Sequence, residues 1–392
     1  MNYQKFLNPD IAAVPPSGIR RFFDMASSMQ DVISLGVGEP DFITPYHIRN
    51  AAINSIIDGE TQYTPNRGLL PLRREISRYL QDRYATPYDP ETEILVTVGA
   101  SESIDTALRA IVSPGDEVLV PQPSYVSYSP SVIFAGGTPV GVETTKDTQF
   151  RLTAENVLRA ITPRTKALIL PYPNNPTGGI MGKSDLEALA EVVREKEILV
   201  ISDEIYSELT YGENTHVSFA SLPGMKDYTL TINGFSKSFA MTGWRVGYIC
   251  GPAALIDVMN KIHQYAILCA PRQGQVAALE ALRSGRENGY ADVVRMRESY
   301  DQRRRLMVTS LRKMGLDCFE PLGAFYVFPD IRLTGLSSEE FCRRLLEEKR
   351  VACVPGTAFG PCGEGFVRCS YATGLDKLTT ALERMEAFIA SL

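Results

Sequence analysis

A single lysine, Lys237, lies between two serines, Ser236 and Ser238, in the segment NGFSKSFAMTGWRVGY. An amine among small side chains is accessible and easily desolvated, and a desolvated lysine can attack a carbonyl to form a Schiff base. Arg245 follows eight residues later, beside Trp244, the only tryptophan, and a guanidinium can hold a phosphate by two parallel hydrogen bonds. Together these residues favour a phosphate-bearing aldehyde held as an imine. Taken alone, such a segment is more often a surface lysine and a structural arginine.

The composition argues against several classes of protein. The chain has 392 residues, is 44% hydrophobic and 22% charged, and carries a formal net charge of −6. These values are typical of a soluble globular protein with one large and one smaller domain. The negative charge argues against nucleic acid as a partner, no apolar run is long enough to cross a membrane, and the N-terminus lacks the apolar region of a signal peptide.

Cysteine and histidine spacing indicates neither a disulfide framework nor a metal centre. The seven cysteines are odd in number and form no CxxC pair, and the three histidines lie far apart. Neither residue type shows the spacing of a metal site. We therefore expect reduced thiols, no metal centre and a cytoplasmic location.

Strands and helices alternate through the middle of the chain. Expected strands cover residues 94–98, 117–120, 167–170, 198–201, 228–232 and 246–250. Helices are expected between several of them, and this alternation predicts a mostly parallel sheet flanked by helices. Ser184 with Glu187 suggests a capping box for a helix that ends near Lys196. An amphipathic helical stretch follows over residues 253–284.

A glycine turn separates the first of these strands from its helix. Gly99, Ala100 and Ser101 form this turn. Unpaired N–H groups at a helix N-terminus are suited to binding phosphate. The turn matches neither GxGxxG nor a P-loop, so neither a dinucleotide nor a nucleoside triphosphate is implied. An ordinary turn with a serine cap is the alternative.

Four further side chains follow expected strands, where ligands of α/β sheets bind. Tyr125 could stack on a heterocycle or pack in the core. Asn175, in the loop PYPNNPTGG, can donate a hydrogen bond to a ligand oxygen. Asp203 and Tyr206 follow the strand at 198–201, and a buried carboxylate needs a partner such as a protonated ring nitrogen. A helix cap would also explain Asp203.

The two ends of the chain contain further candidates. Arg368 lies in the otherwise apolar segment FVRCSYA, and a buried arginine should have an anionic partner, either a structural salt bridge or a ligand. Residues 290–314 favour a long helix, and residues 323–329, GAFYVFP, a hairpin. The loop GVGEPDF, which contains Gly38, fits a plain turn, and Tyr63 fits either a contact residue or a surface tyrosine.

The glycine turn, Tyr125, NNPTG, DEIY and SKSFAMTGWRVGY occur in an order that resembles the pyridoxal-phosphate-dependent aminotransferases of class I and II, fold type I. The resemblance extends from the GVGEPDF loop to Arg368. It implies an α/β fold with a three-layer large domain, built on a mostly parallel sheet flanked by helices, and a smaller α+β domain built from both chain ends. We expect an N-terminal arm and part of the small domain in residues 1–44, the large cofactor domain in 45–288 and the small C-terminal domain in 289–392.

The resemblance also implies roles around pyridoxal 5′-phosphate. Lys237 would form the Schiff base and move a proton between the substrate α-carbon and the cofactor. Asp203 would keep the ring nitrogen protonated, so that the ring remains an electron sink. Tyr206 and Asn175 would bond the phenolic oxygen, and Tyr125 would stack on the ring.

The remaining implied contacts bind the phosphate and the substrate. The phosphate would be held by the turn and two side chains, which are Gly99, Ala100, Ser101, Ser236 and Arg245. Arg368 would bind the substrate α-carboxylate, with help from the Gly38 backbone and Asn175. Tyr63 would reach the phosphate of a neighbouring subunit, which implies a homodimer with active sites at its interface.

The implied reaction moves the amino group of an L-amino acid to a 2-oxo acid, with 2-oxoglutarate as the expected acceptor, in a ping-pong cycle. Some aspartate-specific members have a lysine at the position of Ser101, so aromatic or diaminopimelate-type donors are at least as plausible as aspartate. A carbon–sulfur β-lyase or an aminocyclopropane carboxylate synthase would share the fold and cofactor and is an alternative. A non-catalytic regulator with a DNA-binding domain is disfavoured by the negative charge and by the short segment before Val32.

Overall fold

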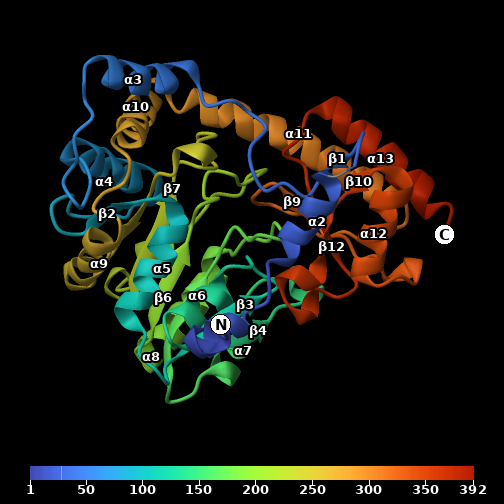
Figure 1. Ribbon diagram of the computed structural model, residues 1–392, viewed down its shortest axis with the longest axis horizontal. Helices are drawn as coiled ribbons and strands as arrows, with labels where there is room; N and C mark the ends of the chain where they lie inside the picture. Colours follow the sequence, from blue (N-terminus) through green and yellow to red (C-terminus); the bar gives the residue numbers. More distant parts are fainter. Residues whose placement is uncertain (28) are drawn as a thin grey trace.

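A seven-stranded sheet forms the centre of the larger part of the molecule (Figure 1). The computed structural model describes residues 1–27 and 29–392, and their side chains except those of residues 20–24. The strands of the sheet are β2 (Ile94–Thr97), β3 (Glu117–Gln122), β4 (Thr138–Glu143), β5 (Thr165–Leu170), β6 (Leu199–Asp203), β7 (Thr229–Gly234) and β8 (Gly247–Cys250).

The strand order across this sheet is β2-β8-β7-β6-β5-β3-β4. β8 is antiparallel to both of its neighbours, and every other pair in the sheet is parallel. The prediction of a mostly parallel sheet is therefore confirmed. β4 was not among the expected strands; it pairs with β3 at one edge of the sheet.

Helices cover both faces of the sheet. They are α3 (Tyr46–Ile57), α4 (Leu70–Tyr84), α5 (Gly99–Ile111), α6 (Tyr128–Phe134), α7 (Ala154–Ala160), α8 (Lys183–Lys196), α9 (Ala253–Ala266) and α10 (Arg272–Asn288). Ile169 of β5 packs in a core shared with α5 and α9, whereas its neighbours Leu168 and Leu170 pack in a core shared with α7 and α8. Because side chains alternate across a strand, this division buries the sheet on both faces.

Segments from near both ends of the chain come together beside α11 (Ala291–Lys313), as the positions of β1 and β10 show (Figure 1). β1 (Ile33–Ser34) pairs in parallel with β10 (Val351–Ala352), so the start of the chain joins a strand near its end. Leu35 completes this contact by packing in a core that also contains side chains of α11, α12 (Ser338–Lys349) and α13 (Leu375–Ile389). The expected small α+β region is therefore present, while the exact boundaries at residues 44 and 288 stay a prediction.

This smaller region also contains a three-stranded sheet of order β11-β12-β9. Its strands are β9 (Tyr326–Val327), β11 (Val354–Pro355) and β12 (Val367–Ser370), and α2 (Gly18–Ser27), α12 and α13 lie in the same region. α1 (Pro9–Ala13) instead contacts α6 of the larger part. Short 3-10 helices lie between elements throughout the chain: η1 (Tyr3–Phe6), η2 (Lys146–Thr148), η3 (Phe219–Ser221), η4 (Lys226–Tyr228), η5 (Thr242–Trp244), η6 (Arg332–Thr334), η7 (Gly356–Phe359) and η8 (Pro361–Gly363).

Two local predictions are wrong. GAFYVFP is not a hairpin, because β9 pairs with β12 later in the chain. α8 begins at Lys183, and the Gly182 N–H donates to the carboxylate of Asp185 at 3.0 Å, so Ser184 lies inside the helix. In both cases a neighbouring contact outweighs the local pattern. The amphipathic stretch expected at 253–284 is helical, and it consists of two helices, α9 and α10, with Pro271 as the N-cap of the second.

No helix in residues 1–27 and 29–392 combines the length and the apolar character needed to cross a bilayer. No group of three or more His, Cys, Asp or Glu side chains there is arranged to hold a metal ion.

Candidate active site

Four of the predicted site residues lie at one edge of the large sheet. Tyr125, Asn175 and Lys237 come after β3, β5 and β7, and Asp203 is the last residue of β6. These four strands are neighbours and run parallel, so their carboxyl ends lie side by side. The sheet thus brings together side chains that are widely separated in sequence, at the edge where α/β proteins bind ligands.

Asp203 is buried at this edge, and each of its carboxylate oxygens accepts a hydrogen bond. The Tyr128 hydroxyl donates to Oδ2 at 2.8 Å, and the backbone N–H of Ile205 donates to Oδ1 at 3.2 Å. Burial raises the pKa of Asp203 to about 6, although both hydrogen bonds act in the opposite direction. A cation placed against this carboxylate would favour its charged form.

The amine of Lys237 lies close to the start of the chain. Its Nζ donates to the backbone oxygen of Gly38 at 2.6 Å. Burial lowers the pKa of Lys237 to about 8; the charge of Glu39 opposes this shift, and those of Arg368 and Arg245 add to it. An amine that loses its proton near neutral pH can serve as a nucleophile and as a proton carrier.

The loop that contains Gly38 is fastened to the loop that follows Lys237. The Thr242 hydroxyl donates to Oε2 of Glu39 at 2.9 Å, and the Thr44 hydroxyl donates to the backbone oxygen of Ala240 at 2.6 Å. The indole N–H of Trp244 donates to the same threonine at 3.0 Å. The plain turn favoured by the local sequence is therefore an incomplete account, since this loop forms one wall beside the amine.

The glycine turn lies at the other end of the site, beneath Arg245. Gly99 begins α5 with φ +73, and a Cβ at this position would lie 2.5 Å from Nη2 of Arg245. A Cβ on Gly247 of β8 would lie 2.5 Å from the N atom of Ala100. Glycine at both positions therefore lets β8, the helix start and the arginine approach one another.

Charge and exposure at this end fit an anion. Arg245 is exposed, and its Nη1 donates only to the backbone oxygen of Thr242, at 3.0 Å, in the described part of the chain. Ser236 is buried and Ser101 is exposed. Helix N–H groups with a nearby guanidinium are a suitable combination for a phosphate.

Arg368 is 2% exposed, although it carries a full positive charge. Its Nη1 donates to Oδ1 of Asn175 at 2.8 Å, and its Nη2 donates to the backbone oxygen of Gly36 at 2.5 Å. Its Nε is buried without a hydrogen-bond partner among the described residues. No acidic side chain among those described lies within ion-pair distance, so the structural salt bridge left open by the sequence is absent from this part of the molecule.

Two aromatic rings enclose this guanidinium. The ring centroids of Tyr326 and Phe359 lie 4.5 Å and 4.9 Å from its Cζ. The hydroxyl of Tyr326 also lies 2.9 Å from the hydroxyl of Tyr206. The guanidinium is therefore held in a fixed position with N–H groups still available, an arrangement that suits an incoming carboxylate.

Sequence reasoning missed Tyr128, Tyr326 and Gly36 as members of this cluster. Tyr128 belongs to the motif PQPSYVSY, three residues after Tyr125, and the presence of a second tyrosine so close to a predicted ligand residue was a usable signal. Tyr326 and Gly36 carried no such signal. They join the site through strand pairing and a backbone oxygen, both of which depend on distant segments.

Tyr63 lies apart from the other predicted residues. It is 80% exposed. None of the hydrogen bonds or ring contacts found among the described residues joins it to Lys237 or Arg245. Within one subunit it therefore contributes nothing to this cluster, and its predicted contact with a partner's phosphate stays a prediction.

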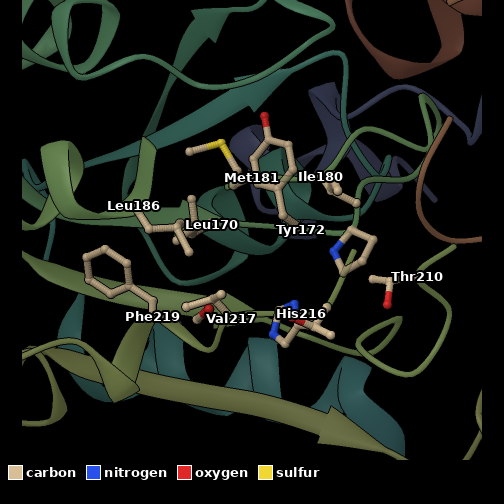
Figure 2. Close-up of a pocket in the computed structure, with 12 residues that line it drawn as sticks. Leu170, Tyr172, Ile180, Met181, Leu186, Thr210, His216, Val217 and Phe219 are labelled. Carbon is tan, nitrogen blue, oxygen red and sulfur yellow. The ribbon is translucent and has the colours of Figure 1, made fainter. Parts of the chain in front are cut away.

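A separate cavity of about 20 Å³ lies between β5, β6, α8 and the segment 215–219 (Figure 2). Its lining is largely apolar, and it includes Leu170, Leu186, Phe219, Thr210 and His216. None of the predicted site residues lines it. A cavity of this size accommodates about one water molecule, so it is too small for an amino acid and is not a second substrate site.

Comparisons with known proteins agree on one family. The family described as aminotransferase class I and II matches residues 30–385. The chain is 51% identical to the putative aminotransferase YugH of Bacillus subtilis, with 98% of each chain covered. It is 48% identical to an aspartate aminotransferase of Pyrococcus abyssi, with 95% of each covered. The solved structure of an aromatic aminotransferase from Pyrococcus horikoshii superposes with a TM-score of 0.90 at 46% identity, covering 95% of this chain and 99% of that one.

Proposed function

The chain belongs to the aminotransferases of class I and II, and from that membership we propose that the cluster around Lys237 moves the amino group of an L-amino acid to a 2-oxo acid, with 2-oxoglutarate as the acceptor. The observation that carries this proposal is the guanidinium of Arg368. It is buried with unpaired N–H groups in the same cluster as an amine whose pKa is lowered. An α-amino or 2-oxo acid brings the carboxylate that such a cation lacks.

The residues present fit pyridoxal 5′-phosphate, the cofactor on which this family depends. Asp203 offers a buried carboxylate to a ring N–H, and Lys237 offers an amine to an aldehyde. At the opposite end, Gly99 leaves room for Arg245 beside the N–H groups of α5, where a phosphate would be held. The unlike groups along one sheet edge thus complement the ring nitrogen, the aldehyde and the phosphate of one molecule.

When bound, pyridoxal phosphate supplies an electron sink that stabilises negative charge on the α-carbon of the amino acid. In our proposal, the protein's own groups do the rest. Arg368 binds and orients the α-carboxylate, with the Nδ2 of Asn175 as a second donor. Lys237 would take the proton from the α-carbon of the donor and pass it to the cofactor carbon that carries the aldehyde, and with the 2-oxo acid it would move a proton in the opposite direction. Asp203 holds a proton at the ring nitrogen, and Tyr206 donates to an oxygen of the cofactor.

Two relatives support different amino acids as the amino donor. One is named for aspartate and the other for aromatic substrates. Ser101 provides no positive charge at the position where some aspartate-specific members have lysine. We therefore propose a donor range that includes aromatic amino acids, with aspartate and diaminopimelate-type donors to be tested beside them.

A donor panel tests this function. Purified protein with pyridoxal phosphate is given aspartate, phenylalanine, tyrosine or diaminopimelate, with and without 2-oxoglutarate, and glutamate is measured. We expect glutamate from at least one donor only when the acceptor is present. Pyruvate and ammonia released without an acceptor would instead identify an eliminating enzyme, and the transferase proposal would be rejected.

We also propose that the protein acts as a homodimer. Large apolar side chains are exposed just before α3, on α3, in the loop after it and at the end of α9, and these are Ile43, Tyr46, Ile53, Ile57, Tyr63 and Tyr265. The last two segments adjoin, because Asn66 donates to the backbone oxygen of Leu268 at 2.8 Å and Arg272 pairs with Glu60. A second copy would bury this surface. Light scattering should give twice the chain mass of 43.3 kDa.

A further inference from the structure

Tyr326 occupies the centre of the candidate site, yet the proposed function assigns it no role. It is the first residue of β9 and is fully buried. Ser370 of β12 lies opposite it, so Arg368, two residues earlier on the same strand, projects from the same face of the sheet. Diagonal neighbours of this kind are within reach of aromatic and long side chains.

The side chain of Tyr326 contacts both a predicted substrate-binding residue and a predicted cofactor-binding residue. Its ring lies against the guanidinium of Arg368, with 4.5 Å between Cζ and the ring centroid. Its hydroxyl lies 2.9 Å from that of Tyr206. The same hydroxyl would lie 2.6 Å from a Cβ at Gly38, the residue whose backbone oxygen accepts the hydrogen bond from Lys237. One side chain therefore adjoins three of the predicted site residues, one of which accepts the hydrogen bond from Lys237.

Packing alone does not account for the hydroxyl. A phenylalanine would fill the same volume and present the same face to Arg368. The neighbouring residue Phe325 belongs to the same buried core and needs no such group. Keeping a buried hydroxyl requires a partner, and the partner found here is the hydroxyl of Tyr206.

The direction of this hydrogen bond follows from the proposed role of Tyr206. A tyrosine has one O–H to donate. If Tyr206 donates it to an oxygen of the cofactor, Tyr326 must be the donor to Tyr206. Hydrogen bonds arranged in a chain polarise one another, so the second donor strengthens the first.

We infer that Tyr326 is a positioning residue that links the substrate end of the site to the cofactor end, with its ring holding the Arg368 guanidinium and its hydroxyl orienting Tyr206. The inference rests on the proposed function, because that function assigns Arg368 to the substrate carboxylate and Tyr206 to the cofactor. It predicts that the ring and the hydroxyl of Tyr326 affect different measured quantities.

Two variants separate the ring from the hydroxyl, and a third serves as the control. Tyr326→Phe removes only the hydroxyl, whereas Tyr326→Leu also removes the ring face. Tyr371→Phe is the matched control, since Tyr371 is another fully buried tyrosine of the same core, and its hydroxyl donates to the backbone oxygen of Ala324 at 3.2 Å. For each holoenzyme, kcat is measured with the best donor. The dissociation constants of maleate and 3-phenylpropionate are measured from the change in cofactor absorbance.

We expect Tyr326→Phe to lower kcat roughly fivefold, as for the loss of one buried hydrogen bond, while both acids bind as they do to the wild type. Tyr326→Leu should in addition weaken binding of the acids roughly tenfold, because a desolvated cation–π contact is lost. Tyr371→Phe should change neither quantity. Acid binding needs no turnover, so this readout is independent of the reaction catalysed.

A double-mutant cycle with Tyr206→Phe tests the coupling directly. If Tyr326 acts through Tyr206, Tyr326→Phe should cause no further loss of kcat in the Tyr206→Phe background. Equal losses in both backgrounds, or wild-type acid affinity in Tyr326→Leu, would overturn the inference and leave the proposed function standing. Wild-type protein that binds neither acid would overturn the assignment of Arg368, and with it both proposals. Acid binding without any glutamate formation would count against the proposed function alone.

Discussion

Two arginines mark the two ends of the candidate site, and they lie in opposite surroundings. Arg245 is exposed and lies over the start of α5, where β8 and that helix of the larger part approach each other. Arg368 is buried between two aromatic rings and is held by Asn175 and Gly36, which come from the middle and the start of the chain. The surroundings of Arg245 come from the larger part alone, whereas those of Arg368 come from both parts of the molecule.

This difference in exposure indicates that the two ends of the site have different binding roles. At an exposed site water screens the charge, so an anion there needs several donors, and the N–H groups of α5 supply them. In a buried site each charge-assisted hydrogen bond contributes more, and an unpaired cation is costly. The exposed end is suited to keeping a permanently bound phosphate, whereas the buried end is suited to distinguishing between ligands that come and go.

Lys237 lies between the two ends, and its removal should have the largest effect. Lys237→Ala should lower the transamination rate by roughly three orders of magnitude or more, because the proton carrier is lost. It should also abolish the visible absorbance given by cofactor bound through the lysine. Lys183→Ala, which alters an exposed lysine of α8, is the control and should leave both unchanged. Retained absorbance in Lys237→Ala would mean that another residue binds the aldehyde.

Paired substitutions of the two arginines test the comparison itself. Arg368→Ala should lower kcat/KM by about a hundredfold or more, since two charge-assisted hydrogen bonds to the carboxylate are lost, while the cofactor stays bound. Arg245→Ala should do the reverse, weakening cofactor retention in dialysis while KM for the amino acid changes little once cofactor is in excess. If both variants lose cofactor equally, the proposed division between the ends is wrong.

Asp203 should show opposite effects with and without the cofactor. Burial raises the pKa of Asp203 to about 6, so between roughly pH 4 and 6 the folded protein holds a proton that the unfolded chain releases. Stability therefore falls as pH rises through this range, and the loss persists above it. Cofactor-free Asp203→Asn should be more stable than the wild type by roughly 2–3 kcal/mol at pH 8, and by about half of that at pH 5.

With the cofactor bound, the order should reverse, because Asn cannot stabilise a protonated ring nitrogen. Thermal unfolding of both proteins at the two pH values, with and without pyridoxal phosphate, provides the measurement. If the variant is less stable than the wild type in the cofactor-free form at pH 8, burial does not disfavour the charged carboxylate of Asp203.

Tyr128 should give the smallest effect in this series. Tyr128→Phe removes the donor to Oδ2 of Asp203 and should weaken cofactor binding roughly threefold to tenfold. Tyr88→Phe is the control, because Tyr88 is also a buried tyrosine and its hydroxyl lies 2.9 Å from the hydroxyl of Thr231, away from the site. Equal cofactor dissociation constants for the two variants would mean that the Tyr128 hydroxyl does not contribute to cofactor binding.

The cofactor end was largely predictable from local sequence. Gly99, Asp203 and Lys237 each lie within a few residues of a predicted strand, and adjacent parallel strands must end at one edge. Tyr128, the residue missed at this end, follows Tyr125 by three positions. The errors here concern boundaries, as at Ser184, where a nearby carboxylate formed the cap instead.

The substrate end was predictable only as a set of open alternatives. The sequence identified Arg368 as an arginine in an apolar strand, but a salt bridge explained it as well as a ligand did. Its surroundings come from the pairing of β9 with β12 and from Gly36 and Asn175. Local patterns specify none of these contacts, because their partners are separated by long stretches of chain.

The sequence by itself determined the fold class, the family resemblance and the residues able to do the chemistry, because strand periodicity and short motifs act over a few residues. Only the tertiary structure decided which groups are buried, and burial sets the reactivity of this site. It lowers the pKa of Lys237, raises that of Asp203 and leaves Arg368 without an acidic partner among the described side chains. These properties arise from the removal of water by segments distant in the chain, which no local pattern records.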